Sequence, residues 1–396
     1  MTNTSHSPNT PRTHVVVVGG GYAGTLAANR LQQQSAVDVT LLNPRPIFVE
    51  RIRLHQYAAG TGTATIDYPD LLGDRVRLVV DSADRIDAAD RRIQLASGAA
   101  LDYDYLIYAV GSTGAITPTV PGATEFAYSI AELEQAQQLL ARLDEVAPDA
   151  PVAVVGGGLT GIEAAAELAG QGRTVTLVCG QRLGPSLQAA GRRSVAKALH
   201  RLGVDVREAA VVEQVRADAL VLRDGSVLPS ELTVWTAGFG VPDLAASSGL
   251  ATDALGRLLT DETLTSIDNP WIVAAGDAVA PSGRPLRMSC QAAMPMGAQA
   301  ADTVLARIAG TPPAALNQAF LSQCISVGRH AATIQLTRLD DTPVKAVIGG
   351  RLATAVKEGI CRGTVWLIRR EAAKSGSYRW VKGGSRAASL EQETVV

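Results

Sequence analysis

Two glycine-rich loops with the same spacing are the residues best suited to do chemistry in this sequence. They consist of Gly19, Gly20, Gly21 and Gly24, and of Gly156, Gly158 and Gly161. Each loop follows a valine-rich run and precedes an alanine-rich one, which predicts a strand, a tight turn and a helix. The first glycine allows the bend, the second lets a pyrophosphate approach the backbone, and the third lets helix and strand pack closely. One loop would be a weak signal, but the duplication predicts two dinucleotide-binding units.

The residue after the second strand of such a unit is usually an acid that binds ribose hydroxyls, and neither unit has one. Asn43 stands there in the first unit and can still donate and accept hydrogen bonds to a ribose. Cys179 stands there in the second and removes the carboxylate that would repel a 2′-phosphate. Arg182, three residues on, is either a phosphate ligand or a solvated loop arginine. The pattern predicts that NADPH is tolerated and leaves NADH open.

Three further strands are expected to end beside a cofactor, at 101–112, 231–240 and 269–279. The first two end in small residues, Ala109 and Gly111 in one and Gly238 in the other, which permit close approach. The third ends in Gly276-Asp277. A carboxylate after an apolar strand is costly to bury without hydrogen bonds, so a ribityl hydroxyl or a helix N-cap role is expected for Asp277.

The bulk composition limits the class of protein. The chain has 396 residues, 46% hydrophobic content and a net charge of −2, typical of a globular protein of two or three domains with no affinity for nucleic acid. Four scattered cysteines without paired spacing predict no metal site and fit a cytoplasmic protein. No apolar run reaches the ~18 residues of a membrane span.

Together these motifs resemble the two-dinucleotide-binding flavoprotein family, which includes glutathione reductase, ferredoxin reductases, apoptosis-inducing-factor-like proteins and type II NADH dehydrogenases. The resemblance covers roughly residues 14–310. It implies that the first loop binds the ADP half of FAD, the second binds NAD(P)H, and Gly276-Asp277 holds the ribityl and phosphate region. A helix with Pro295 in its first turn, ending near Ile308, would point its N-terminus at the flavin, with Met294 beside the cofactor. Cys290 would lie near the flavin or be a buried filler.

The implied fold is α/β, with two Rossmann-like domains and a small C-terminal α+β domain. The expected segments are a disordered leader at 1–12, a discontinuous FAD domain at 13–115 and 262–312, an inserted NAD(P)H domain at 116–261, a C-terminal interface domain at 313–375, and a flexible tail at 376–396. Within the C-terminal domain, strands are expected at 324–336 and 343–348, and a helix at about 350–369.

The stretch from Asn43 to Gly60 decides between branches of the family. Disulfide-reducing relatives carry a redox cysteine pair about 30 residues beyond the first loop, and this stretch contains no cysteine. The resemblance therefore excludes thioredoxin- or glutathione-type reduction through a dithiol at this place.

"FVERIRLHQ" instead resembles the P-Y-x-R-P-x-L-S-K segment of ferredoxin-reductase-like and apoptosis-inducing-factor-like members. The resemblance implies that Arg51 contacts FAD. It places the family's flavin-side lysine, which pairs with the glutamate of GxGxxGxE, at Gln56. The glutamate is present as Glu163, so His55 or Gln56 is expected as its hydrogen-bonding partner, with a histidine making flavin reactivity pH-dependent. The alternative is a short amphipathic helix with an ion pair between positions 50 and 53.

The C-terminal region is basic, with nine basic residues against two acids between positions 351 and 386. Such a region, with the apolar "VWLI", suits either a peripheral contact at the inner face of the membrane or a docked helix with a solvated basic face. A homodimer is also open.

The resemblance implies an FAD enzyme that passes electrons from NAD(P)H to a quinone-like acceptor without a protein thiol. Two alternatives stay open. One is a reductase of a small redox protein that serves a monooxygenase system, and the other is a flavin-bound NAD(P)H sensor with low turnover.

Overall fold

The computed structural model describes residues 12–115, 119–383 and 386. Its first lobe is built on a parallel five-stranded sheet in the order β21-β9-β1-β2-β5. The strands are β1 (Thr13–Val18), β2 (Val37–Asn43), β5 (Val76–Val80), β9 (Tyr105–Tyr108) and β21 (Ile272–Ala274). Residues 15–18 of β1 are four buried valines, as expected for a parallel strand covered on both faces. Because β21 comes from far along the chain, the first domain is discontinuous.

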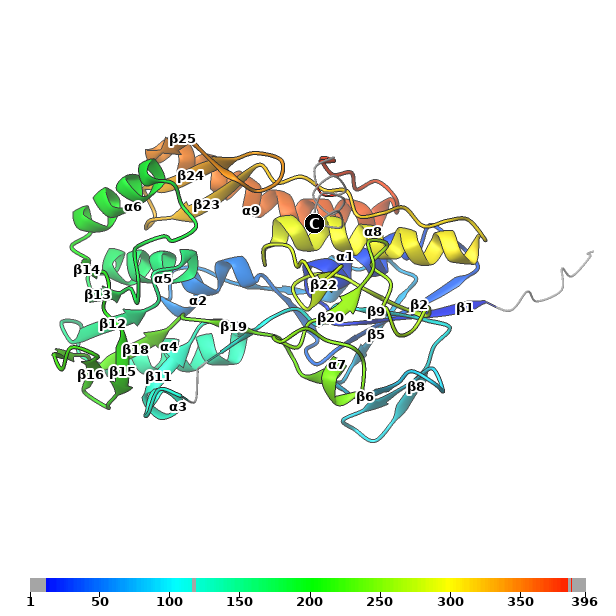
Figure 1. The fold of residues 1–396 in the computed structure, drawn as a ribbon, viewed down its shortest axis with the longest axis horizontal. Coiled ribbons are helices and arrows are strands. Elements are labelled where there is room, and N and C mark those ends of the chain that lie inside the picture. Colours follow the sequence, from blue (N-terminus) through cyan, green and yellow to red (C-terminus); the bar gives the residue numbers. More distant parts are fainter. Residues whose placement is uncertain (1–11, 116–118, 384–385, 387–396) are drawn as a thin grey trace, which may run out of the picture.

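The second lobe repeats this arrangement with a parallel sheet in the order β11-β18-β12-β13-β14. Its strands are β11 (Ala127–Ser129), β12 (Pro151–Val155), β13 (Thr174–Val178), β14 (Asp205–Arg207) and β18 (Leu232–Trp235). The longer helices of the two lobes are α1 (Tyr22–Leu31), α4 (Leu133–Glu145), α5 (Leu159–Gly170), α6 (Ala189–Arg201) and α8 (Cys290–Ile308). The predicted α/β fold with two Rossmann-like domains is confirmed, and Figure 1 shows the lobes side by side.

Smaller elements connect the main strands. The short strands are β3 (Ile47–Val49), β4 (Thr65–Asp67), β6 (Ala83–Asp87), β7 (Arg92–Leu95), β8 (Ala100–Asp102), β10 (Thr113–Gly114), β15 (Val212–Val215), β16 (Ala219–Leu222), β17 (Val227–Pro229), β19 (Phe239–Gly240), β20 (Leu258–Thr260) and β22 (Val279–Pro281). The short helices are η1 (Arg51–Arg53), α2 (Leu54–Ala58), η2 (Tyr68–Asp70), α3 (Ala123–Phe126) and α7 (Leu244–Ser247).

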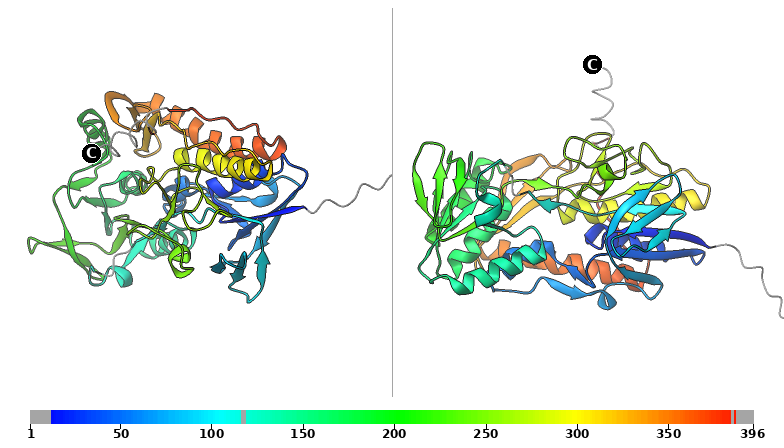
Figure 2. Two further views of the ribbon diagram at one scale, coloured as in Figure 1. Left: turned by 45° about the vertical axis from the view of Figure 1, so that its right-hand side comes forward. Right: turned by 90° about the horizontal axis from the view of Figure 1, so that it is seen from below.

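The C-terminal part joins the two lobes. It contains the antiparallel strands β23 (Ser322–Ser326), β24 (Ala332–Thr337) and β25 (Pro343–Gly349), followed by α9 (Gly350–Ala373). The single strand expected at 324–336 is a hairpin, because the chain turns at Gly328, whose φ is +73°. The sheet packs on α6 of the second lobe while α9 extends to α1 of the first (Figures 1 and 2).

Helix α8 begins earlier than the sequence suggested. Ser289 is its N-cap and accepts a hydrogen bond from the backbone N–H of Ala292 at 3.3 Å, so the helix starts at Cys290. Pro295 therefore lies inside the helix rather than in its first turn, and the prediction for that residue was wrong. The predicted end at Ile308 was right.

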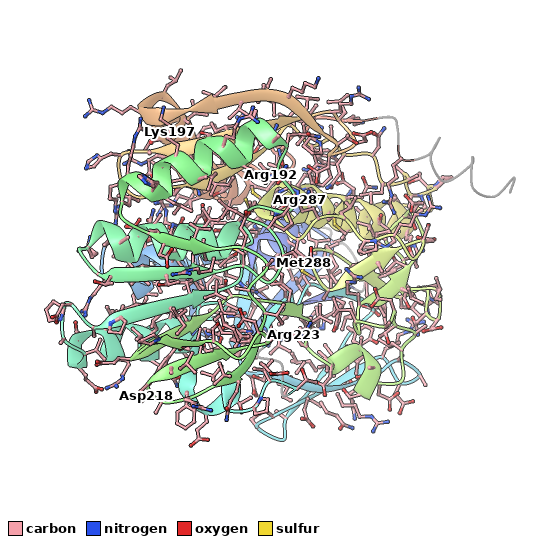
Figure 3. The ribbon with its side chains drawn as sticks, turned by 60° about the vertical axis from the view of Figure 1, so that its left-hand side comes forward. Arg192, Lys197, Asp218, Arg223, Arg287 and Met288 are labelled. Carbon is pink, nitrogen blue, oxygen red and sulfur yellow. The ribbon has the colours of Figure 1, made fainter. Side chains whose placement is uncertain are left out.

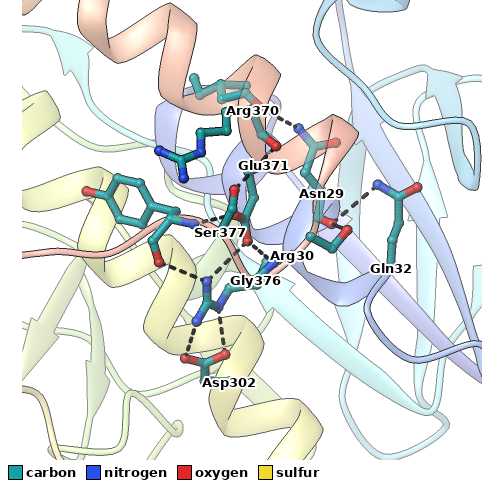
Figure 4. A network of polar contacts seen from close by, with 11 residues as sticks. Asn29, Arg30, Gln32, Asp302, Arg370, Glu371, Gly376 and Ser377 are labelled. Atoms are coloured by element: carbon teal, nitrogen blue, oxygen red, sulfur yellow. Dashed lines mark hydrogen bonds and ion pairs between the residues drawn. The ribbon is translucent and has the colours of Figure 1, made fainter.

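The segment after α9 is packed, in contrast to the flexible tail expected from residue 376. The carboxylate of Glu371 accepts hydrogen bonds from the backbone N–H groups of Gly376 and Tyr378, and it pairs with Arg30 of α1 at 3.1 Å. Arg30 also pairs with Asp302 of α8 (Figure 4). The rest of the tail, and residues 1–11 of the expected leader, lie outside the described residues.

Candidate active site

A cavity of about 450 Å³ opens at the carboxyl ends of the first sheet, where open α/β sheets bind ligands. Many of the residues predicted to bind FAD line it, namely Gly19, Gly20, Gly21, Asn43, Arg51, Ala109, Gly111, Gly276 and Asp277. These positions are distant in sequence, and the parallel strands β1, β2, β9 and β21 bring them together because each strand ends at the same edge.

The first glycine loop has the backbone that a nucleotide cradle needs. Gly19 has a φ of +103°, which a side chain would strain. A Cβ at Gly24 would collide with the carbonyl oxygen of Gly19, so the third glycine is required for the helix to pack on the turn. A Cβ at Gly21 would meet nothing within 4 Å, so the space beside that residue is open to a ligand. The loop therefore fits a bound dinucleotide.

A polar group lies where this cavity adjoins a second, larger one. Ser112 donates its hydroxyl to Asp277 at 2.8 Å, and Arg51 donates to the backbone carbonyl of Ser112. These three residues and Ser289 line both cavities. Burial raises the pKa of Asp277, while the Ser112 hydroxyl and the charge of Arg51 oppose that rise. The group is placed to hold a cofactor that extends from one cavity into the other, as FAD would.

Asn43 has protein partners for both ends of its amide. Its oxygen accepts from the backbone N–H of Gly20 at 2.9 Å, and its nitrogen donates to the carbonyl of Arg45 at 2.8 Å. Tyr68 donates its hydroxyl to the carbonyl of Gly20 at 2.7 Å. Asn43 therefore orders the glycine loop from the second strand, and its contact with a ribose stays a prediction. Tyr68 was missed because it comes from a short segment far from the loop in sequence.

The larger cavity has a volume of about 640 Å³ and lies between the two lobes and the C-terminal part. The predicted residues along it are Arg51, His55, Glu163, Gly238, Asp277 and Met294. Arg287 and Met288 also line it, and Figure 3 shows them near the middle of the molecule, on the stretch that precedes α8.

Glu163 lies at the inner side of this cavity and accepts two hydrogen bonds. Its Oε1 accepts a hydrogen bond from the Lys357 ammonium and another from the backbone N–H of Ser326 at 2.9 Å. Its Oε2 is 3.7 Å from Nδ1 of His55. Burial lowers the pKa of Lys357 to about 8. The structure thus places His55 beside Glu163 but too far away for a hydrogen bond, and the partner expected at His55 or Gln56 is instead Lys357, from the other end of the chain.

Gln56 faces another group. Its side-chain oxygen accepts from Arg53 at 3.2 Å, and Arg53 pairs with Glu50 at 3.4 Å and with Glu358 of α9 at 3.0 Å. The short amphipathic helix considered as the alternative therefore exists as η1 and α2, and its charges attach α9 to this stretch. Catalytic roles for His55, Gln56 and Glu163 stay predictions.

Lys357 was missed by the sequence analysis, because no local pattern connects it to Glu163. Two signals could have found it. The family's flavin-side lysine is absent from position 56, and this arginine-rich chain has only five lysines. One of these few lies within the predicted C-terminal helix, one residue before Glu358.

The second glycine loop has the same backbone as the first but lines neither of these two cavities. A Cβ at Gly161 would collide with the carbonyl oxygen of Gly156, and a Cβ at Gly158 would meet nothing within 4 Å. Arg182 is exposed and donates to the carbonyl of Pro185 at 3.4 Å, which matches its alternative interpretation as a loop arginine. Binding of NAD(P)H by these residues stays a prediction.

Three cysteines line the larger cavity, namely Cys290, Cys324 and Cys361. All are free thiols, and burial raises the pKa of each, that of Cys290 to about 12. Across residues 12–115, 119–383 and 386 there is no cluster of acidic, histidine and cysteine side chains suited to a metal ion. None of the helices within those ranges is both long and apolar enough to cross a bilayer.

Residues 13–297 match the family described as pyridine nucleotide-disulphide oxidoreductase. The chain is 32% identical over 350 residues to an NADH dehydrogenase-like protein of Mycobacterium tuberculosis (strain ATCC 25618 / H37Rv), covering 81% of this chain and 87% of that protein. It is 25% identical over 389 residues to the type II NADH:quinone oxidoreductase of Haemophilus influenzae, covering 82% and 87%.

Among solved structures, the sulfide:quinone oxidoreductase of Aquifex aeolicus is similar in fold, with a TM-score of 0.77, 20% identity, and coverage of 97% of this chain and 96% of that one. The match over most of the chain and the fit of both glycine loops lead to one conclusion. This chain belongs to the pyridine nucleotide-disulphide oxidoreductase family, as an enzyme with FAD and NAD(P)H as its cofactors.

Proposed function

We propose that this enzyme passes electrons from NAD(P)H to a quinone-like acceptor that binds in the larger cavity. One observation carries the proposal. The cavity extends from the buried pair of Glu163 and Lys357 to Ile360, on the exposed apolar face of α9. The cavity therefore offers an apolar path by which the acceptor can enter. The charged groups lie at the inner side of the cavity. The relative from Haemophilus influenzae is named as a quinone reductase, which supports this acceptor class.

Reduction of a quinone to a quinol takes two electrons and two protons. The hydride taken from NAD(P)H brings both electrons and one proton, so the cavity must supply one further proton. Bound FAD would accept hydride from NAD(P)H and deliver the electrons. Lys357 is the proposed proton donor, because its lowered pKa of about 8 lets the ammonium release a proton near neutral pH. Glu163 holds the ammonium in place, and Lys357 can regain a proton after each turnover.

The thiols along the cavity are not expected to relay electrons. A thiol acts as a nucleophile through its thiolate, and burial raises the pKa of Cys290 to about 12. Cys361 and Cys324 have raised pKa values for the same reason. We therefore expect serine at positions 290 and 361 to preserve turnover, in keeping with a route that uses no redox disulfide.

The outward face of α9 suits a lipid surface. Its exposed apolar side chains are Leu352, Val356, Ile360 and Trp366, which are 40% to 66% exposed. The exposed arginines on α9 are Arg351, Arg362, Arg369 and Arg370. An apolar face with basic residues beside it is how amphipathic helices bind anionic membranes. We propose that this face lies on the membrane, so that a lipid-soluble acceptor enters the cavity directly.

A second candidate is electron transfer to a small acidic redox protein. The exposed Arg379, which lines the larger cavity, and the arginines of α9 favour it, because such partners dock on basic surfaces.

Stopped-flow spectroscopy separates these candidates. The anaerobic enzyme is reduced with NADH or NADPH and then mixed with a short-chain quinone, a ferredoxin or oxygen. The proposal expects reoxidation by the quinone to be at least about tenfold faster than by the other two. Faster reoxidation by the ferredoxin would replace it with the second candidate. Slow reoxidation by every acceptor would favour the sensor, and a protein that retains no flavin would contradict all three.

A further inference from the structure

The two nucleotide-binding repeats lack an acid at the same place, and each carries one on the neighbouring outer strand. Asn43 ends β2 and Cys179 follows β13, where a ribose-binding acid is usual. The next strand outward in each sheet, β5 or β14, is followed at once by an acid. That acid is Asp81 in the first repeat and Glu208 in the second.

The strand registers place the two acids one residue apart. In the first sheet Asn43 pairs with Val80, the residue before Asp81, so Asp81 lies one residue beyond the level of Asn43. In the second sheet Val178 pairs with Arg207, the residue before Glu208. Glu208 therefore lies on the neighbouring strand level with Cys179, at the place where a ribose-binding acid is usual.

Asp81 shows that an acid after the outer strand can border a nucleotide cavity. It lines the smaller cavity together with Asn43, although it belongs to the strand beyond it. One of its carboxylate oxygens accepts from the backbone N–H of Ser82 at 2.7 Å. The residue after the outer strand thus borders the nucleotide cavity in the first repeat.

Glu208 is held against the loop that would carry the nucleotide in the second repeat. Its Oε1 accepts from the backbone N–H of Leu183 at 2.6 Å, and its side chain is exposed. The same loop is bonded to the second glycine loop, because the backbone N–H of Gly184 donates to the carbonyl of Gly157 at 2.8 Å. A Cβ at Gly157 would lie 2.8 Å from Sγ of Cys179. Glu208 and the second glycine loop are therefore both bonded to the loop that follows β13.

Cys179 cannot replace the missing acid. It is fully buried, and burial raises the pKa of its thiol to about 11, with the charge of Glu208 adding to the rise. Arg182 is directed to the carbonyl of Pro185 rather than toward Glu208. Glu208 is thus the carboxylate held against this loop, which also carries the exposed Arg182.

We infer that Glu208 binds the adenosine ribose of the nicotinamide nucleotide and selects NADH against NADPH. A carboxylate accepts hydrogen bonds from the 2′- and 3′-hydroxyls of NADH, whereas the 2′-phosphate of NADPH would place a second negative charge beside it. In the second repeat the acid stands on the outer strand, level with the usual position on the second strand. The inference rests on the proposed function in that a nicotinamide nucleotide is the electron donor.

Isothermal titration calorimetry of the purified flavoprotein with NAD⁺ and NADP⁺ tests this without any acceptor. We expect NAD⁺ to bind at least about tenfold more tightly, and the preference to shrink as salt is raised. Glu208→Gln keeps an oxygen for the N–H of Leu183 but removes the charge, so it should reduce the preference by about tenfold. The control is Glu213→Gln, an exposed glutamate of β15 in the same lobe, which should change nothing.

Equal binding of the two nucleotides, or tighter binding of NADP⁺, would overturn the inference. An unchanged preference in Glu208→Gln would also overturn it and would leave the residue as a support of the loop. If neither nucleotide binds, the proposed function itself fails, which is a separate result.

Discussion

Lys357 of α9 donates a hydrogen bond to Oε1 of Glu163 on α5, across 194 residues of sequence. The two side chains are only 11% and 13% exposed. A buried charge is costly unless it is paired, and the backbone N–H of Ser326 gives the carboxylate a further donor. The C-terminal helix therefore completes a charged group that neither Rossmann-like domain contains alone.

Lys357→Met should slow reoxidation of the reduced enzyme by quinone at least about tenfold, because the proton donor is lost. Reduction by NADH should change less, since hydride transfer does not consume that proton. Stopped-flow traces of the two half-reactions measure this. Lys345→Met, at an exposed position of β25, is the control. Equal slowing of both half-reactions would show a structural role instead.

The pKa of about 8 for Lys357 gives the sign of the pH dependence. The ammonium can donate a proton only below that value, so turnover with quinone should fall as the pH rises through about 8. The same profile in Lys357→Met should lose this step. A step that persists in the variant would assign the ionisation to another group.

His55 should be neutral throughout the physiological range. Burial lowers its pKa well below 6.5, and the nearby cations Lys357, Arg329 and Arg53 lower it further. The unfolded chain binds a proton near pH 6.5 while the folded protein does not, so stability present above that pH is lost as the pH falls below it. Between pH 7 and 5.5 this should amount to about 1 kcal/mol.

Thermal unfolding at several pH values tests this point. His55→Gln should show a shallower loss of stability toward acid than the wild type, whatever its stability at pH 7. If stability depends on pH in the same way in the variant and the wild type, folding does not lower the pKa of His55. The separate prediction that His55 makes flavin reactivity pH-dependent is tested by the pH profile of flavin reduction in His55→Ala. That profile should differ from the profile of the wild type.

Alanine substitutions at two glycines of the first loop should have different effects. Gly24→Ala places a Cβ against the carbonyl oxygen of Gly19, so the protein should misfold or lose thermal stability. Gly21→Ala places a Cβ in open space, so the protein should fold but bind FAD at least about tenfold more weakly. The flavin-to-protein absorbance ratio and the melting temperature measure both effects. Gly170→Ala, at the end of α5, is the control, and a normal flavin content in Gly21→Ala would contradict the assignment.

Glu371→Gln should destabilise the protein by about 3 kcal/mol, because Arg30 loses a buried partner and the N–H groups of Gly376 and Tyr378 lose a charged acceptor. Urea unfolding measures this. Asp102→Asn removes a partner of Arg92 in an exposed pair and should leave the unfolding midpoint unchanged. Equal effects of the two substitutions would show that the network in Figure 4 does not stabilise the fold.

The double variant Val356→Glu and Ile360→Glu should lose binding to vesicles that contain phosphatidylglycerol. The two side chains lie on the exposed face of α9, and carboxylates there oppose both insertion and attraction to anionic lipid. Flotation with vesicles should show at least about a fivefold loss. Val227→Glu, at an exposed apolar residue of β17, is the control. Absence of binding by the wild type would rule out the membrane contact.

The sequence by itself determined the two nucleotide-binding units. The turn between the strand and the helix needs glycine at positions 19 and 24, because a side chain at either one would collide with nearby backbone. This requirement is local, so a short stretch of sequence is enough to recognise it. The strand that ends in Gly276-Asp277 was found in the same way. The α/β class, the discontinuous first domain and the cofactors followed from the order of these motifs.

Only the tertiary structure decided how the larger cavity is built. The pairing of Lys357 with Glu163, the attachment of α9 to Arg53 and the packing of the chain around Glu371 all join residues that are far apart in sequence. Such contacts depend on which helix faces pack together in the folded protein, and local sequence propensities do not predict that packing. The start of α8 was also misjudged, because the Ser289 cap determined it more than the position of Pro295 did.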